Sequence, residues 1–188
     1  MIRILAFLLV AATWLAGIGP SSAQNNDFFF GGGSNFGYSG SGPIQRTMVS
    51  FDGRYAPGTI VINTAERRLY LVQGNGAALR YGIGVGRDGF RWSGVHRITA
   101  KREWPSWTPP SQMRARRPDL PRYMEGGINN PLGARAMYLG STLYRIHGSN
   151  EPETIGQAVS SGCFRMTNED VQDLYNRVSV GTTVIVKN

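Results

Sequence analysis

Cysteine, histidine and long apolar runs are scarce in this chain of 188 residues. The single Cys excludes internal disulfides and every zinc site that needs two or more thiolates. The two His leave few places for acid–base chemistry. Positive charge is plentiful, because 20 basic residues, 18 of them Arg, stand against 12 acidic ones and give a formal charge of +8. The hydrophobic content of 41% excludes wholesale disorder, and the length suits one domain with an appendage.

The first 23 residues have the pattern of a secretory signal peptide. Arg3 supplies a positive start, Ile4–Gly19 is a run of 16 uncharged residues, and Ser21-Ser22-Ala23 offers the small residues that a signal peptidase accepts. The alternative, a membrane anchor, needs about 18 or more apolar residues. We therefore predict cleavage after Ala23 and export to the periplasm or cell envelope, with no membrane-spanning segment left and a mature charge of +7.

Export changes which anionic partners the positively charged protein can meet. It argues against nucleic acid and leaves wall polymers and anionic lipids as candidates. It also makes an unpaired thiol a reactive liability, because exported compartments oxidise thiols. Cys163 is therefore either buried and inert or chemically useful.

Residues 24–46 are expected to form a flexible linker rich in Gly and Ser, and residues 47–188 one compact domain. Six Gly occur in the 20 residues from Gln24 to Pro43, without any hydrophobic period. The aromatic run Phe28–Phe30 either touches a partner surface or has no role.

Short β-branched runs with close turn signals predict a mainly β domain with one or two short helices. Runs at 137–139 and 142–147 flank Gly140-Ser141, which suits a two-residue hairpin loop. Three earlier runs have the spacing of an antiparallel meander: 59–63, 69–72 and 79–85.

One amphipathic helix and a last strand are expected near the C-terminus. Thr167 or Asn168 can cap the helix, and Asp170 falls in the first turn, where an acid is favourable. A strand at 182–186 follows. Four apolar residues repeat at helical spacing: Val171, Leu174, Tyr175 and Val178.

The stretch from Lys101 to Gly127 is predicted to be a long irregular loop on the surface. It contains five Pro, more than a helix or a central strand tolerates. Residues 101–122 also carry six basic and two acidic side chains. Long loops of this kind are often lids or binding loops, so the stretch either faces a substrate or is simply solvated.

Cys163 and His147 are the residues best suited to nucleophilic catalysis. They lie 16 residues apart, and the Gly and Pro residues between them allow the chain to fold back. A free thiol is only a few per cent ionised at neutral pH, and a neighbouring imidazole can take its proton and store the product as an ion pair. Gly162 lets backbone amides approach a developing oxyanion, and Arg165 can lower the thiol pKa or bind a carboxylate.

Each of these residues also has a purely structural interpretation. Cys163 can be a small core residue, His147 a hydrogen-bonded strand end, and Arg165 an ion-pair partner. His96 has no partner motif and is expected to be structural. Composition and spacing leave these alternatives open.

The segment from His147 to Met166, HGSNEPETIGQAVSSGCFRM, resembles the active-site signature of the L,D-transpeptidases, the YkuD-type catalytic domain. The signature is a His-Gly, a loop of about this length and a Ser-x-Gly-Cys-x-Arg ending. Further stretches that resemble the family lie at 57–72, 107–113, 116–127, 130–140 and 168–186.

This resemblance implies a β-rich sandwich or barrel that acts on peptidoglycan stem peptides, with no metal or organic cofactor. It implies that Cys163 attacks the bond between a diamino acid and the terminal D-alanine of a tetrapeptide stem. His147 would act as general base and then acid, oriented by a backbone carbonyl near Gly148. Arg165 would hold a substrate carboxylate. The resulting thioester would pass to an amine of another stem, and carbapenems would acylate the same thiol.

The resemblance also assigns the oxyanion to amides around Ser161, Gly162 and Cys163, and it has two departures. Many members carry a second His where this chain has Ser161, and a branched aliphatic residue where it has Phe164. Neither change removes a catalytic group. Competing functions keep the acyl-enzyme with another acceptor (water, a free D-amino acid or a Lys of an envelope protein) or keep the fold as a non-catalytic wall-binding module.

Overall fold

The computed structural model describes residues 37–38 and 42–188. The predicted signal peptide and most of the predicted linker therefore lie outside the described residues. At the described end of the linker, β1 (Gly37–Tyr38) pairs with β2, and β2 begins at Arg46, the last residue assigned to the linker from sequence. None of the described helices combines the length and apolar character that a membrane crossing requires.

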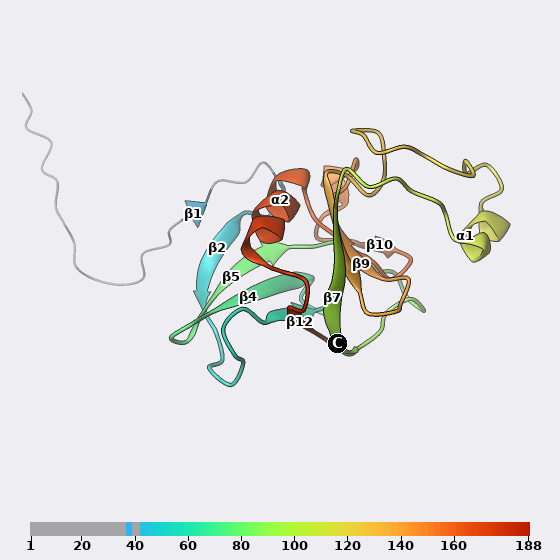
Figure 1. The fold of residues 1–188 in the computed structure, drawn as a ribbon. Coiled ribbons are helices and arrows are strands. Elements are labelled where there is room, and N and C mark those ends of the chain that lie inside the picture. Colours follow the sequence, from blue (N-terminus) through green and yellow to red (C-terminus); the bar gives the residue numbers. More distant parts are fainter. Residues whose placement is uncertain (1–36, 39–41) are drawn as a thin grey trace, which may run out of the picture. The chain divides into compact units, whose positions relative to one another are not determined.

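Strands dominate the described chain, which confirms the mainly β prediction (Figure 1). Ten of them form one sheet in the order β1-β2-β5-β4-β3-β12-β7-β8-β9-β11, and β10 pairs with β6 in a small second sheet. The remaining elements after β1 are β2 (Arg46–Ser50), β3 (Ile60–Asn63), β4 (Arg68–Gly74), β5 (Ala77–Gly82), β6 (Val85–Gly86), β7 (Gly94–Glu103), α1 (Ser111–Arg116), β8 (Arg135–Leu139), β9 (Arg145–His147), the 3₁₀ helix η1 (Pro152–Thr154), β10 (Ala158–Ser160), β11 (Phe164–Arg165), α2 (Asn168–Arg177) and β12 (Thr183–Lys187).

The meander predicted near the start of the domain is confirmed, because β3, β4 and β5 are consecutive antiparallel neighbours. Two parallel pairings are not visible in the local sequence pattern. β12 returns from the C-terminus to lie parallel to β3, and β11 lies parallel to β9. Parallel strands need a long crossover connection, so such partners are always distant in sequence.

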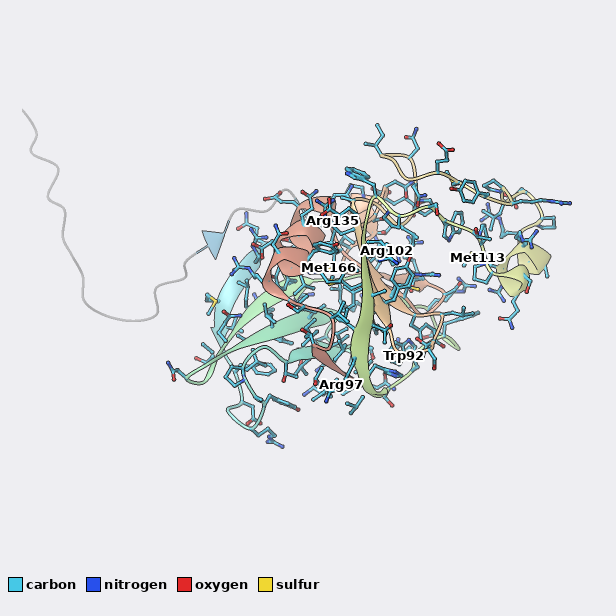
Figure 2. The ribbon with its side chains drawn as sticks, viewed as in Figure 1. Trp92, Arg97, Arg102, Met113, Arg135 and Met166 are labelled. Atoms are coloured by element: carbon cyan, nitrogen blue, oxygen red, sulfur yellow. The ribbon has the colours of Figure 1, made fainter. Side chains whose placement is uncertain are left out.

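The predicted helix is confirmed as α2. The side chain of Thr167 accepts a hydrogen bond from the N–H of Asp170 at 3.1 Å, which makes Thr167 the N-cap. Val171 and Leu174 are fully buried, and Tyr175 packs against the same core. This core continues through the sheet residues to Met166, which Figure 2 labels beside α2. Helix α2 therefore covers one side of the β core, and it begins a few residues after Cys163 in the sequence.

The hairpin of β8 and β9 is present, but its connection is longer than predicted. The N–H of Leu139 donates to the carbonyl of Tyr144, so the loop covers residues 140–143 rather than Gly140-Ser141 alone. The hydroxyl of Thr142 causes the difference, because it donates to the Leu139 carbonyl and accepts from the N–H of Tyr144. This side-chain turn is an alternative to the tight two-residue loop.

The prediction that 101–127 is wholly irregular is wrong at two points. Strand β7 continues to Glu103, and the six-residue helix α1 occupies 111–116. Pro110 stands at the helix N-cap and Pro118 beyond its end, where neither ring disturbs a helical hydrogen bond. The ammonium of Lys101 belongs to the core side of β7, since it donates to the carbonyls of Tyr175 and Val178 at the end of α2. Figure 1 shows α1 on a long connection that extends away from the sheets.

Candidate active site

The parallel pair β9–β11 brings His147 and Cys163 to one pocket. His147 ends β9 and lies opposite Arg165 of β11, and Cys163 immediately precedes β11. Both line a pocket of about 760 Å³, which is larger than a second pocket of about 330 Å³ elsewhere in the domain. The two residues that the sequence singled out for nucleophilic chemistry thus share a cavity, although 16 residues separate them.

His147 is held in a single orientation by the backbone. It is 4% exposed, and its Nδ1 lies 2.6 Å from the carbonyl oxygen of Gly148. Since a carbonyl can only accept, Nδ1 must carry the proton, and Nε2 is left with a lone pair. A Cβ at Gly148 would collide with Oδ1 of Asn168, so this close backbone path requires glycine. The Gly148 carbonyl thus makes the contact that its predicted orienting role requires, and the role itself stays a prediction.

Burial, opposed by the hydrogen bond to Gly148 and aided by the nearby cations Arg165 and Arg145, lowers the pKa of His147 to about 3. The imidazole is therefore neutral at physiological pH. Burial also raises the pKa of the Cys163 thiol, while Arg145 and Arg165 pull in the opposite direction. These shifts favour a neutral thiol–imidazole pair in the resting site, rather than a stored thiolate–imidazolium pair.

Cys163, the predicted nucleophile, lies at the end of a tight turn. The hydroxyl of Ser160 donates to the carbonyl of Cys163 at 2.6 Å and accepts from the N–H of Gly162 at 3.1 Å. Gly162 has φ +108°, and a Cβ there would lie 2.5 Å from Cε1 of Tyr144. The half-buried Cys163 directs its Sγ toward the carbonyl of Leu143 at 3.8 Å. Glycine is thus required at 162 for both conformation and space.

The hydrogen bond from Gly162 to Ser160 alters the predicted oxyanion donors. The N–H of Gly162 is already engaged within the turn. Ser161 lines the pocket, and its hydroxyl lies 3.5 Å from a guanidinium nitrogen of Arg87. Of the amides expected from sequence to bind an oxyanion, Gly162 is the one with a competing partner.

Arginines dominate the charge of the pocket wall. Arg165, predicted to bind a substrate carboxylate, donates to Glu151 at 2.8 Å. Glu151 is the single acidic residue among the residues that line the pocket. The five Arg residues of the lining are Arg87, Arg116, Arg117, Arg145 and Arg165. The site is therefore built for an anionic ligand.

Residues of the proline-rich excursion, the stretch from Lys101 to Gly127, line this pocket. The substrate-facing interpretation of the stretch is therefore favoured over simple solvation. Trp107 and Met124 exchange two backbone hydrogen bonds of 2.8 Å, which close the neck of the excursion. Buried Asn130 fastens its return limb by donating to the carbonyl of Glu125 at 2.8 Å. Pro131 and Leu132 of the lining follow just beyond its end, and the excursion itself contributes both apolar and basic residues: Trp107, Pro110, Gln112, Met113, Arg116, Arg117 and Leu120.

Sequence reasoning missed several residues that shape the site, namely Trp92, Tyr144, Arg145, Glu151 and Ser160. Arg145 and Ser160 were within reach of a sequence argument, because Arg145 lies two residues before His147 and Ser160 three residues before Cys163. Trp92 was not, since it contacts the nucleophile turn across 70 residues of sequence.

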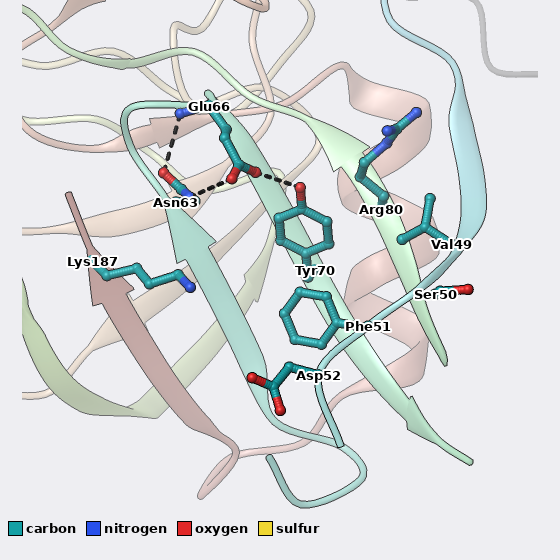
Figure 3. Close-up of a pocket in the computed structure, with 9 residues that line it drawn as sticks. All are labelled: Val49, Ser50, Phe51, Asp52, Asn63, Glu66, Tyr70, Arg80 and Lys187. Carbon is teal, nitrogen blue, oxygen red and sulfur yellow. Dashed lines mark hydrogen bonds between the residues drawn. The ribbon is translucent and has the colours of Figure 1, made fainter. Parts of the chain in front are cut away.

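A second, smaller pocket of about 330 Å³ is lined by residues of the β2–β5–β4–β3–β12 region (Figure 3). Glu66 accepts hydrogen bonds there from the hydroxyl of Tyr70 at 2.5 Å and from the amide of Asn63 at 2.7 Å. Burial and Glu66 raise the pKa of Tyr70 to about 12. Phe51 stacks on Tyr70 with ring centroids 4.7 Å apart. Its lining contains neither Cys nor His, whereas Cys163 and His147, the residues predicted to carry nucleophilic chemistry, line the larger pocket.

Across residues 37–38 and 42–188, no three or more His, Cys, Asp or Glu side chains gather in a way that could hold a metal ion. The lining of the larger pocket offers a thiol, a neutral imidazole, backbone amides and several guanidinium groups. This set suits acyl transfer, in which a thiol attacks a carbonyl and an imidazole moves the proton.

Comparison with known proteins points in the same direction. A family model described as L,D-transpeptidase catalytic domain (YkuD) matches residues 57–186. Probable L,D-transpeptidase YbiS of Escherichia coli is 40% identical over 134 residues, which are 66% of this chain and 43% of that protein. The chain thus aligns with less than half the length of this relative.

Two solved structures have the same fold. A chain from Brucella melitensis, named a probable carnitine operon oxidoreductase, is 50% identical, with a TM-score of 0.52 over 77% of this chain and 94% of that one. The catalytic domain of the Enterococcus faecium L,D-transpeptidase, solved in a form acylated by ertapenem, has a TM-score of 0.54 and 20% identity. That match covers 72% of this chain and 100% of that one. The first name describes an activity different from that of the other relatives.

Proposed function

Because the chain belongs to the L,D-transpeptidase catalytic domain family, we propose that it cleaves and rejoins peptidoglycan stem peptides through a thioester on Cys163. The observation that carries this proposal is the shared pocket of Cys163 and His147, in which Nδ1 of the imidazole is tied to the Gly148 carbonyl. The free lone pair of Nε2 suits it as the general base.

The proposed reaction has two half-reactions. In the first, Nε2 of His147 takes the thiol proton as Sγ attacks the carbonyl carbon between the L-centre of a diamino acid and the terminal D-alanine. The tetrahedral intermediate collapses, the same proton passes to the leaving amine, and D-alanine departs. The second half-reaction reverses these roles: an acceptor amine loses a proton to His147, attacks the thioester and releases the thiol. No proton or electron is left over.

A resting neutral pair supports this sequence of proton transfers. Because its pKa is low, His147 is unprotonated at physiological pH and Nε2 can accept a proton. As a weak base it takes the thiol proton together with formation of the bond from Sγ to carbon. The thiolate that forms during attack lies near Arg145 and Arg165, whose positive charges stabilise it. The thiol is thus deprotonated in the course of attack instead of being ionised beforehand.

The arginine-rich lining supports a substrate that carries several carboxylates, as stem peptides do. Arg165 remains the proposed carboxylate partner, and a bound carboxylate must compete with or join Glu151 at its guanidinium. Ser161 and Cys163 amides remain the proposed oxyanion donors, whereas the N–H of Gly162 is occupied by Ser160. We further propose that carbapenems acylate Cys163, as ertapenem does in the Enterococcus faecium domain.

Export to the periplasm or cell envelope, after removal of residues 1–23, belongs to the same proposal, because it brings the enzyme to its polymer. The acceptor that completes the cycle can be a second stem, water, a D-amino acid or a Lys of an envelope protein. A non-catalytic wall-binding module is the competing function, and an intact Cys163–His147 pocket argues against it.

The test is incubation of the purified protein with muropeptides, followed by mass spectrometry. We expect tetrapeptide stems to lose D-alanine and to yield cross-linked dimers or exchanged products, the identity of which names the acceptor. Binding to the wall polymer without any loss of D-alanine, and without a carbapenem adduct on Cys163, would leave the binding-module function instead.

A further inference from the structure

One aromatic side chain that does not line the pocket forms a hydrogen bond to the peptide group between Gly162 and Cys163. The indole N–H of Trp92 donates to the carbonyl of Gly162 at 2.7 Å. Trp92, labelled in Figure 2, lies in the segment before β7 and is half-buried. It is absent from the lining of the pocket, whereas Cys163 and Ser161 belong to that lining. Trp92 thus holds the carbonyl of Gly162 without belonging to the pocket lining.

The geometry of a peptide bond turns this contact into a constraint on Cys163. The carbonyl of Gly162 and the N–H of Cys163 belong to one planar peptide group, and no cis peptide occurs in the described ranges. In a trans peptide the N–H points away from the carbonyl. Fixing the carbonyl toward Trp92 therefore aims the N–H of Cys163 in the opposite direction.

Trp92 is itself locked in place by its neighbours. Its ring stacks on Tyr144 with centroids 4.4 Å apart and an interplanar angle of 11°. Its centroid also lies 5.3 Å from that of the Phe164 ring and 5.1 Å from that of the His96 ring, which it meets in a T-shaped arrangement. Tyr144 also lies against the position a Cβ of Gly162 would take. A ring held on several sides loses little further entropy when it makes its hydrogen bond.

The N–H of Gly162 cannot take over this role. The N–H of Gly162 donates to Ser160, so the peptide group held by Trp92 supplies the next donor along the chain. A hydrogen bond to the carbonyl of a peptide also polarises its N–H and makes it a better donor. Both effects concern the N–H that would receive negative charge when a thiol attacks a carbonyl.

We propose that Trp92 is a positioning residue that orients and polarises the Cys163 N–H as an oxyanion donor. The proposal rests on the acyl-transfer function above and extends it to a residue that touches neither the substrate nor the thiol. It separates two tasks of the turn: the thiol itself does not need Trp92, whereas the stabilisation of a tetrahedral oxyanion does.

The experiment compares two reactions of the same thiol in Trp92→Phe, which keeps the stacked ring but removes the indole N–H. Acylation by a carbapenem passes through an oxyanion, whereas alkylation by iodoacetamide is a displacement at carbon that forms none. We expect acylation to slow by roughly tenfold or more, below the roughly 100- to 1,000-fold cost of deleting an oxyanion donor. Alkylation should stay within about twofold of wild type, since the thiolate fraction that governs it does not change.

His96→Gln is the matched control, because it removes another ring that touches Trp92 without altering the bond to Gly162. It should leave both rates unchanged, in keeping with the structural role expected for His96. Equal acylation rates in Trp92→Phe and wild type would overturn the assignment, and so would a parallel loss of acylation and alkylation, the mark of a disturbed turn. A wild-type protein that reacts with iodoacetamide but not with the carbapenem would instead overturn the proposed function.

Discussion

At the scale of single residues, the site depends on which groups carry charge. His147 is buried and neutral, Cys163 is a half-buried thiol, and the charge near them belongs to Arg145 and Arg165. An enzyme that stores a thiolate needs a proton acceptor with a pKa well above that of His147 here. In the proposed reaction the proton instead passes to His147 while the bond from Sγ to carbon forms.

The first prediction concerns Arg145. Its replacement in Arg145→Gln removes a positive charge that lowers the pKa of the Cys163 thiol. The thiol pKa should rise, and alkylation by iodoacetamide at pH 7.5 should slow by up to about tenfold, the effect of one pKa unit. Arg87→Gln is the control, since Arg87 lines the same pocket but contacts Phe90 and Ser161. A pH profile of alkylation identical to wild type in Arg145→Gln would contradict this role.

The second prediction follows from the low pKa of His147. Between about pH 3 and about 6.5 the unfolded chain binds a proton at this residue and the folded chain does not. The free energy of unfolding therefore falls as the pH is lowered through this window, by on the order of 1 kcal/mol per pH unit. In His147→Gln this loss should disappear, as measured by urea unfolding at pH 7, 6 and 5.

The pKa shift of Asp170 changes the free energy of unfolding in the opposite direction, and Asp170 is present in both wild type and His147→Gln. Burial raises its pKa to about 6, so its folded form keeps a proton at pH values where the unfolded form has lost it, and its contribution favours the folded state at low pH. Because it cancels in the comparison, the difference between wild type and His147→Gln isolates the imidazole. Parallel pH profiles for the two proteins would contradict a buried, neutral His147.

At the scale of elements, the site depends on how β2 and α2 are fastened to the core. Arg46 of β2 lies 3.2 Å from Asp170 and 3.4 Å from Asp173 of α2, and the side chain of Asp170 is 1% exposed. The hydroxyl of Tyr81 in β5 also donates to Asp173 at 2.6 Å. This network joins the start of the domain to the helix that follows the nucleophile.

The third prediction is the cost of breaking this network. Arg46→Ala leaves the buried Asp170 without its partner, and we expect the free energy of unfolding to fall by about 3 kcal/mol. The exposed pair of Arg54 and Asp52 supplies the control, because Arg54→Ala should leave the denaturation midpoint unchanged. A midpoint for Arg46→Ala equal to that of Arg54→Ala would show that the pair does not fasten β2.

Elements with local signals could be predicted from the sequence, and elements set by distant contacts could not. The cap of α2, its apolar face and the meander follow from neighbouring residues, and all three are confirmed. The parallel pairing of β12 with β3 joins Val184 to Ile60, for which no local pattern exists. Helix α1 was missed because Pro was counted against it, although Pro is tolerated just outside a helix.

The same division applies to the site. Cys163, His147 and Gly148 belong to a short motif with a chemical logic, and the structure places the first two in one pocket. The bond from Trp92 to Gly162 and the approach of Arg145 to the thiol depend on the tertiary fold. The occupied N–H of Gly162 was also beyond prediction, since it follows from the orientation of one hydroxyl, that of Ser160.

At the scale of the whole molecule, part of the excess of Arg over acidic residues lines the larger pocket. The formal charge is +8, and five Arg residues line the larger pocket against one Glu. Guanidinium groups bind carboxylates in a bidentate manner, so the charge serves recognition as well as attraction. A substrate rich in carboxylates should therefore be drawn to this face.

The fourth prediction tests this attraction. Raising the salt concentration from about 50 to about 500 mM shortens the screening length from roughly 14 to roughly 4 Å and should lower kcat/KM for stem peptides several-fold. The rate of alkylation by neutral iodoacetamide should stay nearly constant over the same range. A salt-independent kcat/KM would contradict a role for the pocket arginines in substrate capture.

The central claim is that Cys163 carries the acyl group of a stem peptide, and intact-protein mass spectrometry measures it directly. After brief exposure to a tetrapeptide stem and acid quenching, the wild-type protein should gain the mass of the stem less D-alanine, on the peptide that contains Cys163. Cys163→Ala, with an unchanged melting temperature, should gain nothing. An adduct on Cys163→Ala, or turnover of the stem by that variant at the wild-type rate, would contradict the account.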